Sequence, residues 1–175
     1  MEDVGDEIVA LYDADGRPAG SAPRSLVRRD NLHHGATAVV VRNRAGDLYV
    51  HRRTETKDVY PGMHDCCAGG VLKYGEEPLE AATRELAEEL GVTGVVLSPV
   101  TTTTYRDQHT SYVAFVYETR YDGPITWQPE EVAWGTWMSV DALRARLGDP
   151  GWPFVPDSRA LIADWLGLDR NDTDG

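Results

Sequence analysis

The chain has 175 residues and a mass of 19.3 kDa, which predicts one domain over residues 1–168 and a frayed C-terminal tail at 169–175. Its 17 basic and 29 acidic residues give a net charge of −12, which argues against nucleic-acid binding through a broad basic surface. No apolar run approaches the ~18 residues of a membrane span, the N-terminus is acidic, and the two cysteines are adjacent, so we expect a cytoplasmic protein without membrane anchor or disulfide framework.

The N-terminal part of the chain predicts short strands joined by turns. Strands are expected at residues 7–12, 36–42, 48–53 and, more briefly, 63–68, because these runs are β-prone and are bounded by turn residues. Residues 18–23 are expected to form a loop, and residues 24–31 a short helix or a turn.

Residues 78–90 predict the clearest helix of the chain. Pro78 lies near its start, where a missing N–H costs nothing, and Gly91 follows its end. An apolar stripe runs along one face and consists of Leu79, Ala82, Leu86 and Leu90. The helix is therefore expected to pack against the rest of the protein through this stripe.

The C-terminal part predicts further strands and then two helices. The strands are expected at 92–100, 111–117 and 136–138, and the helices at 141–147, with Ser139 as N-cap, and at 157–166, with Asp157 as N-cap. Hairpins around one central helix, followed by terminal helices, predict the α/β class with a mixed sheet covered by helices.

Three glutamates of the central helix form the most informative pattern. Glu85, Glu88 and Glu89 are spaced at i, i+3 and i+4, so helical geometry places them on one face. Their carboxylates repel one another unless positive charge lies among them; Arg84 supplies one charge, and Mg²⁺ or Mn²⁺ could supply the rest. A solvated helix with ion pairs is the alternative interpretation of such a run.

The residues around the glutamates resemble the Nudix box. The nine defined residue types of this motif all occur over residues 70–92, at Gly70, Glu76, Arg84, Glu85, Leu86, Glu88, Glu89, Gly91 and Val92. The chain is therefore similar to Nudix hydrolases, which cleave compounds containing a diphosphate. The resemblance implies an α/β/α sandwich with a mixed β-sheet and a loop–helix–loop metal site, in agreement with the predicted elements.

The resemblance also implies residue roles in the box. Glu85, Glu88 and Glu89 match the metal ligands, with help from the carbonyl of Gly70, and the expected cofactor is Mg²⁺ or Mn²⁺. Glu76 and Arg84 match structural residues that pair with groups around the box helix.

The general base varies within the family. It could be Glu88, Glu89 or a glutamate of a later loop, where Glu130 and Glu131 precede a predicted strand. An ordinary acidic turn is the alternative interpretation of this later pair.

A second resemblance, over residues 32–156, is to isopentenyl-diphosphate isomerases, which share the Nudix fold. The matching stretches are Leu32-His33, Arg53 with Lys57, Tyr60-Pro61-Gly62, Cys66-Cys67, Glu131-Val132 with Trp137, and residues 152–156. In the isomerases, the residues matching Arg53 and Lys57 bind the substrate diphosphate, the one matching Cys67 is catalytic, and the one matching His33 is a metal ligand. A surface charge cluster is the alternative interpretation of Arg53 and Lys57.

The departures from the isomerases favour hydrolysis. Gly69 and Leu26 occupy two places where the isomerase metal site needs histidine, and Gln108-His109-Thr110 stands in place of a Glu-x-Glu pair. The Nudix box, which is degraded in isomerases, is intact here. We therefore read Cys66 and Cys67 as buried packing residues and His33 as a hydrogen-bonded structural residue.

The sequence thus predicts Mg²⁺-dependent hydrolysis of a phosphoanhydride bond in a nucleoside-diphosphate-type or related small metabolite. The alternatives are isopentenyl-diphosphate isomerase activity and a non-catalytic module that binds a diphosphate metabolite. The expected partner is the small-molecule substrate, without nucleic acid or membrane, and a homodimer is a further expectation.

Overall fold

The computed structural model describes residues 7–168, and the acidic N-terminal residues and the predicted tail at 169–175 lie outside this range. The described residues form eight strands and four helices. In chain order these are β1 (Ile8–Tyr12), β2 (Pro18–Pro23), α1 (Arg24–Asp30), β3 (His34–Arg42), β4 (Leu48–Arg53), β5 (His64–Asp65), α2 (Pro78–Leu90), β6 (Ser98–Arg106), β7 (Ser111–Arg120), β8 (Val132–Met138), α3 (Val140–Leu147) and α4 (Pro156–Leu166).

The strands form a mixed sheet with β3 at its centre. β3 pairs in parallel with β7 along its whole length and antiparallel with β1 and β4. β6 extends the sheet beyond β7, and β8 and β5 both pair with β4. Eight of the nine residues of β3 are buried, as expected for a strand with a parallel partner and helices on both faces of its sheet.

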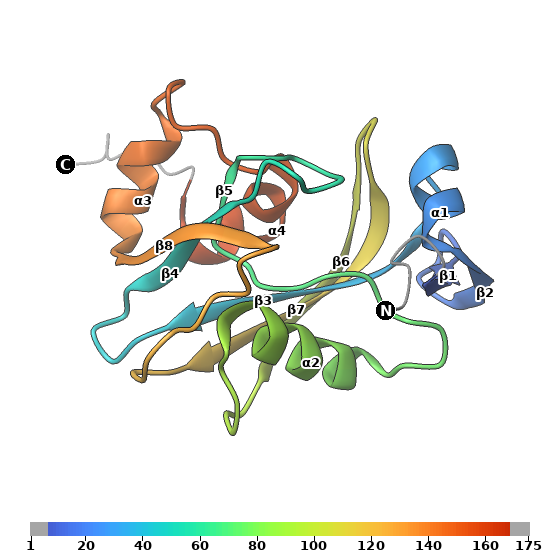
Figure 1. The fold of residues 1–175 in the computed structure, drawn as a ribbon, viewed down its shortest axis with the longest axis horizontal. Helices are drawn as coiled ribbons and strands as arrows, with labels where there is room; N and C mark the ends of the chain where they lie inside the picture. The colour runs from blue at the N-terminus through green and yellow to red at the C-terminus, as the bar shows by residue number, and fades with distance from the viewer. Residues whose placement is uncertain (1–6, 169–175) are drawn as a thin grey trace.

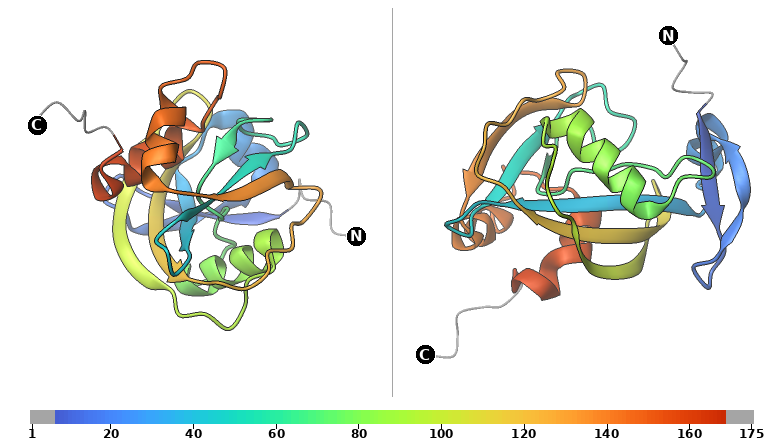
Figure 2. Two further views of the ribbon diagram at one scale, coloured as in Figure 1. Left: turned by 90° about the vertical axis from the view of Figure 1, so that its left-hand side faces the viewer. Right: turned by 90° about the horizontal axis from the view of Figure 1, so that it is seen from below.

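Alternation along β3 divides the core into two layers. Val39 and Val41 pack on one face with Leu86 of α2, whereas Val40 packs on the other face with Leu143 of α3 and Ile162 of α4. Figures 1 and 2 show α2 along one side of the sheet and α3 with α4 on the other. The predicted mixed-sheet α/β/α architecture is thereby confirmed.

The predicted box helix has the predicted bounds. Pro78 is at its start, and Gly91 ends it in the left-handed region at φ 65°, with its N–H donating to the Ala87 carbonyl. The predicted stripe is wrong at one position: Leu79 is 51% exposed, because contact with the sheet begins one turn later at Ala82.

Several predicted elements differ from the structure. Residues 18–23 form strand β2, which the sequence did not reveal because, within residues 7–168, it pairs only with β1 and five of its six residues are exposed. The strand expected at 92–100 begins at Ser98 and continues through four consecutive threonines to Arg106. Of residues 63–68, only His64 and Asp65 form a strand.

The helices among residues 7–168 are all too short or too polar to cross a membrane.

Candidate active site

Helix α2 and the loop before it bring three carboxylates together. Glu89 is buried, the Glu85 side chain is 15% exposed, and the Glu88 side chain is half exposed. The Gly69 N–H donates to Glu89 Oε2 at 3.2 Å. At Gly70, a Cβ atom would lie 2.7 Å from Glu85 Oε1, so the absence of a side chain is what lets this carboxylate approach the loop.

Arg84 holds the loop against the helix. Its Nε and Nη2 atoms donate to the two carboxylate oxygens of Glu76 at 2.8 and 2.9 Å, a bidentate ion pair. Its Nη1 donates to Glu85 at 2.8 Å and lies 3.4 Å from Glu88. Burial would raise the pKa of Glu76, but the hydrogen bonds from Arg84 and the Lys73 amide hold it below its usual value. The pairing expected of Glu76 and Arg84 is therefore present.

The positive charges near Glu85 and Glu89 do not offset the effect of burial on their pKa values. Burial raises the pKa of Glu89 well above its usual value, and the nearby charges of Glu85 and Glu131 raise it further, against the opposing effect of Lys57. Burial likewise raises the pKa of Glu85 despite its contact with Arg84. Burial and mutual repulsion disfavour the charged form of these carboxylates. A divalent cation that prefers oxygen ligands would compensate for both effects.

The carbonyl of Gly70 has room for one more partner. It accepts a hydrogen bond from the Thr37 N–H at 2.9 Å, and a carbonyl oxygen has a second lone pair. Together with Glu85, Glu88 and Glu89, it gives an all-oxygen donor set of the kind that Mg²⁺ and Mn²⁺ bind.

Glu131 joins this cluster from a distant part of the chain. It lies just before β8, and its carboxylate forms an ion pair with the Lys57 ammonium. The turn that carries Glu131 contacts α2, because the Gln128 N–H donates to the Glu89 carbonyl at 3.0 Å, and the charge of Glu131 raises the pKa of Glu85 and Glu89. Glu130, its neighbour, is exposed and contributes only its backbone carbonyl, to the Thr54 hydroxyl at 2.9 Å.

A pocket of about 100 Å³ adjoins the glutamates at Gly69 and Gly70. Arg53 and Lys57 line it, and Arg53 donates to the Val59 carbonyl at 2.8 and 3.1 Å. Arg52 points to the surface, where it pairs with Glu55. The alternation of β4 thus directs Arg53 inward, as predicted.

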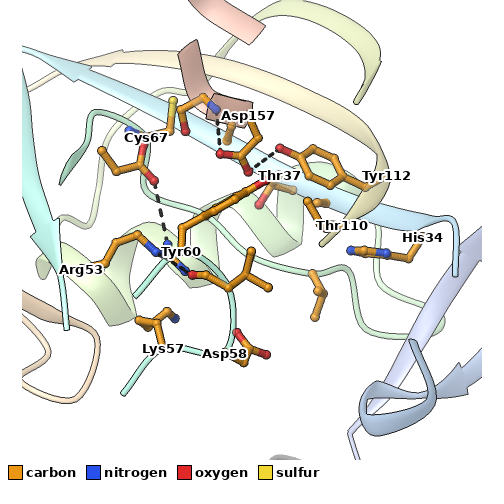
Figure 3. Close-up of a pocket in the computed structure, with 18 of the residues that line it drawn as sticks. His34, Thr37, Arg53, Lys57, Asp58, Tyr60, Cys67, Thr110, Tyr112 and Asp157 are labelled. Carbon is orange, nitrogen blue, oxygen red and sulfur yellow. Dashed lines mark hydrogen bonds and ion pairs between the residues drawn. The ribbon is translucent and has the colours of Figure 1, made fainter. Parts of the chain in front are cut away.

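The opposite wall of the pocket carries groups that sequence reasoning missed. The Tyr112 hydroxyl donates to Asp157 at 2.8 Å, and Figure 3 shows this pair across the pocket from Arg53, Lys57 and Asp58. Burial and the charge of Asp65 raise the pKa of Asp157 to about 6. Asp157 is not the N-cap of α4, since that position is Val155.

The residues of the isomerase resemblance are present, but the isomerase metal site is not. Cys67 is buried and lines the pocket, and His33 Nδ1 lies 2.7 Å from the Ser111 hydroxyl. A Cβ atom at Gly69 would lie 1.9 Å from the backbone oxygen of Thr37. Because backbone fills that space, the histidine of an isomerase would not fit at this position.

Comparison with known proteins identifies the family of this domain. A family model for the NUDIX domain matches residues 32–158. The chain is 48% identical over 170 residues to an uncharacterized Nudix hydrolase, orf19, of Rhodococcus erythropolis. The alignment covers 91% of this chain and 92% of that protein. It is 34% identical over 160 residues to the uncharacterized Nudix hydrolase YfcD of Escherichia coli (strain K12), an alignment that covers 91% of this chain and 87% of that protein.

Solved structures share the architecture. The crystal structure of DR0079 from Deinococcus radiodurans has a TM-score of 0.77 at 25% identity and covers 90% of this chain and 98% of its own. The MutT protein from Methanosarcina mazei Go1 has a TM-score of 0.63 at 21% identity, with 81% and 96% covered. The second likeness bears on the fold alone.

Proposed function

The chain belongs to the Nudix hydrolase family, and on that premise we propose that it hydrolyses a phosphoanhydride bond in a nucleoside-diphosphate-type or related small metabolite, with Mg²⁺ or Mn²⁺ as cofactor. Enzymes of this family act on small molecules and generally use divalent metal cations. One observation carries the proposal: Glu85 and Glu89 contact the Gly69–Gly70 loop that lines a pocket with Arg53 and Lys57, and Arg84 links Glu85 to Glu88.

The residues have separate tasks in this proposal. A bound cation, held by the three box glutamates and the Gly70 carbonyl, would neutralise diphosphate oxygens and lower the pKa of a bound water. Arg53 and Lys57 pair with phosphate oxygens of the substrate from the pocket side. A carboxylate of Glu88, Glu89 or Glu131 accepts the proton of the attacking water, and Lys57 holds Glu131 in position.

The two alternatives have less support. Isomerase activity would need a metal site that the space at Gly69 does not allow. A pure binding module would have no chemical need for buried carboxylates whose charges oppose one another in the absence of a cation. We therefore retain hydrolysis as the function. We propose that the protein acts in the cytoplasm as a homodimer, each copy a single domain over residues 1–168.

Substitution of the box glutamates tests the proposal. Glu88→Gln and Glu89→Gln are each expected to lower metal-dependent turnover by about 10²–10⁴-fold, since each loses a ligand or base. The variants should stay folded, because an amide oxygen at position 89 can still accept from the Gly69 N–H.

Glu80→Gln is the matched control, since Glu80 lies exposed in the first turn of the same helix. Turnover is measured by mass spectrometry of the phosphorylated products, and folding by circular dichroism. Wild-type rates in both box variants would show that the assignment of the box is wrong.

A further inference from the structure

We propose that the pocket contains a second anion site, formed by Arg24, Arg28 and Thr37, that binds a phosphomonoester of the substrate separate from its diphosphate. This inference rests on the proposed function, because it concerns the substrate of the same pocket. It narrows the substrate to diphosphate compounds that carry a further phosphate group.

Three arginines converge on two consecutive residues of one loop. Arg24 and Arg28 of α1 lie 3.1 and 3.0 Å from the same carboxylate oxygen of Asp58, and Arg53 donates to the carbonyl of Val59. Asp58 is one carboxylate for two guanidinium groups, and Glu7 supplies only a longer contact of 3.3 Å to Arg24. Asp58 and Glu7 balance the charges of Arg24 and Arg28, but Arg28 has donors to spare: within residues 7–168 only its Nε atom is hydrogen-bonded, to Asp58, and burial lowers the pKa of its guanidinium despite that contact.

Arg24 and Arg28 belong to a different element from Arg53 and Lys57, the cations beside the box. Arg53 ends β4 and Lys57 lies in the loop after it, and the charges of both act on Glu89. Arg24 and Arg28 also come from α1, which precedes the residues matched by the family model, 32–158. The box can thus engage a diphosphate while the N-terminal element engages another group.

A buried hydroxyl without a hydrogen-bond partner indicates that the pocket binds a ligand. Thr37 lines the pocket and is 6% exposed, and its Oγ1 atom has no hydrogen-bond partner within residues 7–168. Buried hydroxyls without a partner are costly, and a phosphate oxygen would supply the missing acceptor. Figure 3 shows Thr37 on the floor of the pocket, with Asp58 and Lys57 on one side.

The size and chemistry of the site favour a phosphate group. About 100 Å³ accommodates several water molecules and therefore one tetrahedral anion. Guanidinium groups bind phosphate oxygens through paired, charge-assisted hydrogen bonds. His34, which also lines the pocket, adds no charge at neutral pH, because burial lowers its pKa to about 4.

The test compares pairs of compounds that differ only in a remote phosphomonoester. Coenzyme A with its 3′-dephospho form is one pair, and NADP with NAD is the other. In each pair, affinity is measured by isothermal titration and kcat/KM by phosphate-product analysis. For at least one pair, wild-type protein should prefer the phosphorylated member by about tenfold or more.

Variants of α1 attribute that preference to the site. Arg28→Gln should reduce the ratio to about twofold or less, and Arg28→Lys should restore part of it. Arg29→Gln is the matched control, because Arg29 is the neighbouring residue, points to solvent and pairs only with Asp30 among residues 7–168. Thermal unfolding of all variants separates loss of the site from loss of the fold.

The outcomes separate the two proposals. A binding preference that depends on Arg28 without turnover of any compound would contradict the proposed hydrolysis and support the anion site. Equal affinity within both pairs, absence of binding, or a preference that survives Arg28→Gln would overturn the anion site, whatever the result for hydrolysis.

Discussion

At the scale of single residues, burial determines the charge of the groups around the pocket. His34 is 2% exposed, and its Nδ1 atom lies 2.9 Å from the Leu32 carbonyl. Burial lowers the pKa of His34 from 6.5 to about 4, with smaller effects from the charges of Arg28 and Arg24. The native protein therefore keeps this imidazole neutral at a pH where the unfolded chain binds a proton.

This difference predicts a loss of stability in acid. A pKa that is lower in the folded state contributes stability above pH 6.5, which is lost as the pH falls towards 4. The change corresponds to about 3 kcal/mol of unfolding free energy. His34→Gln should remove this part of the pH dependence, measured by urea unfolding between pH 7 and pH 4.

The other titratable groups are present in both the wild type and the His34→Gln variant, so the difference between their pH profiles is due to His34. His51 acts in the same direction, because burial lowers its pKa to about 3. Asp157 acts in the opposite direction, since its raised pKa stabilises the fold as the pH falls through about 6. Parallel curves for wild type and variant would contradict the buried, neutral state of His34.

The role of the Cys67 thiol differs between the hydrolase and the isomerase hypotheses. Its thiol is buried in the pocket, and its backbone N–H donates to Asp65 Oδ1 at 2.9 Å. Cys67→Ala should leave the hydrolysis rate within about twofold, because the box carries the chemistry, and should cost about 1 kcal/mol of stability. Complete loss of hydrolysis in a folded variant, measured by mass spectrometry of the phosphorylated products, would instead favour the isomerase mechanism.

At the scale of elements, the loop before α2 matters as much as the helix. The Gly70 backbone is close to Glu85, and only a glycine leaves room for that carboxylate. Gly70→Ala should displace it, raise the metal concentration needed for half-maximal rate and lower turnover by about tenfold or more.

Gly148→Ala provides the control for this substitution. Its added Cβ would meet nothing closer than the Ala145 carbonyl at 3.6 Å, far from the box in sequence. Turnover is measured against Mg²⁺ concentration for both variants. An unchanged metal dependence in Gly70→Ala would contradict the placement of Glu85 as a ligand.

The sequence predicted some helices and strands correctly and missed or misplaced others. Helix α2 was predicted at its correct bounds because Pro78 and Gly91 mark its ends and its carboxylates follow helical spacing. Strand β2 was missed because hydrogen bonds to β1, rather than an apolar face, hold it. The start of β6 was misplaced because its exposed face carries no apolar alternation.

At the scale of the whole molecule, the candidate site unites segments that lie far apart in the chain. Lys57 and Glu131 are 74 residues apart and form an ion pair, because β8 lies beside β4 in the sheet. Local spacing predicted the box glutamates, since one helix presents them. It could not predict Tyr112 with Asp157, or Arg28 with Asp58, because tertiary packing alone brings each pair together.

The central claim, hydrolysis of a diphosphate bond, is tested most directly by product analysis. The protein is incubated with Mg²⁺ or Mn²⁺ in heavy-oxygen water, with nucleoside di- and triphosphates, nucleotide sugars, dinucleotides, coenzyme A and isopentenyl diphosphate, and the products are analysed by mass spectrometry. Hydrolysis predicts cleavage of at least one compound, with one heavy oxygen in a product phosphate. Conversion of isopentenyl diphosphate alone, at unchanged mass and shifted retention time, would contradict it and establish the isomerase.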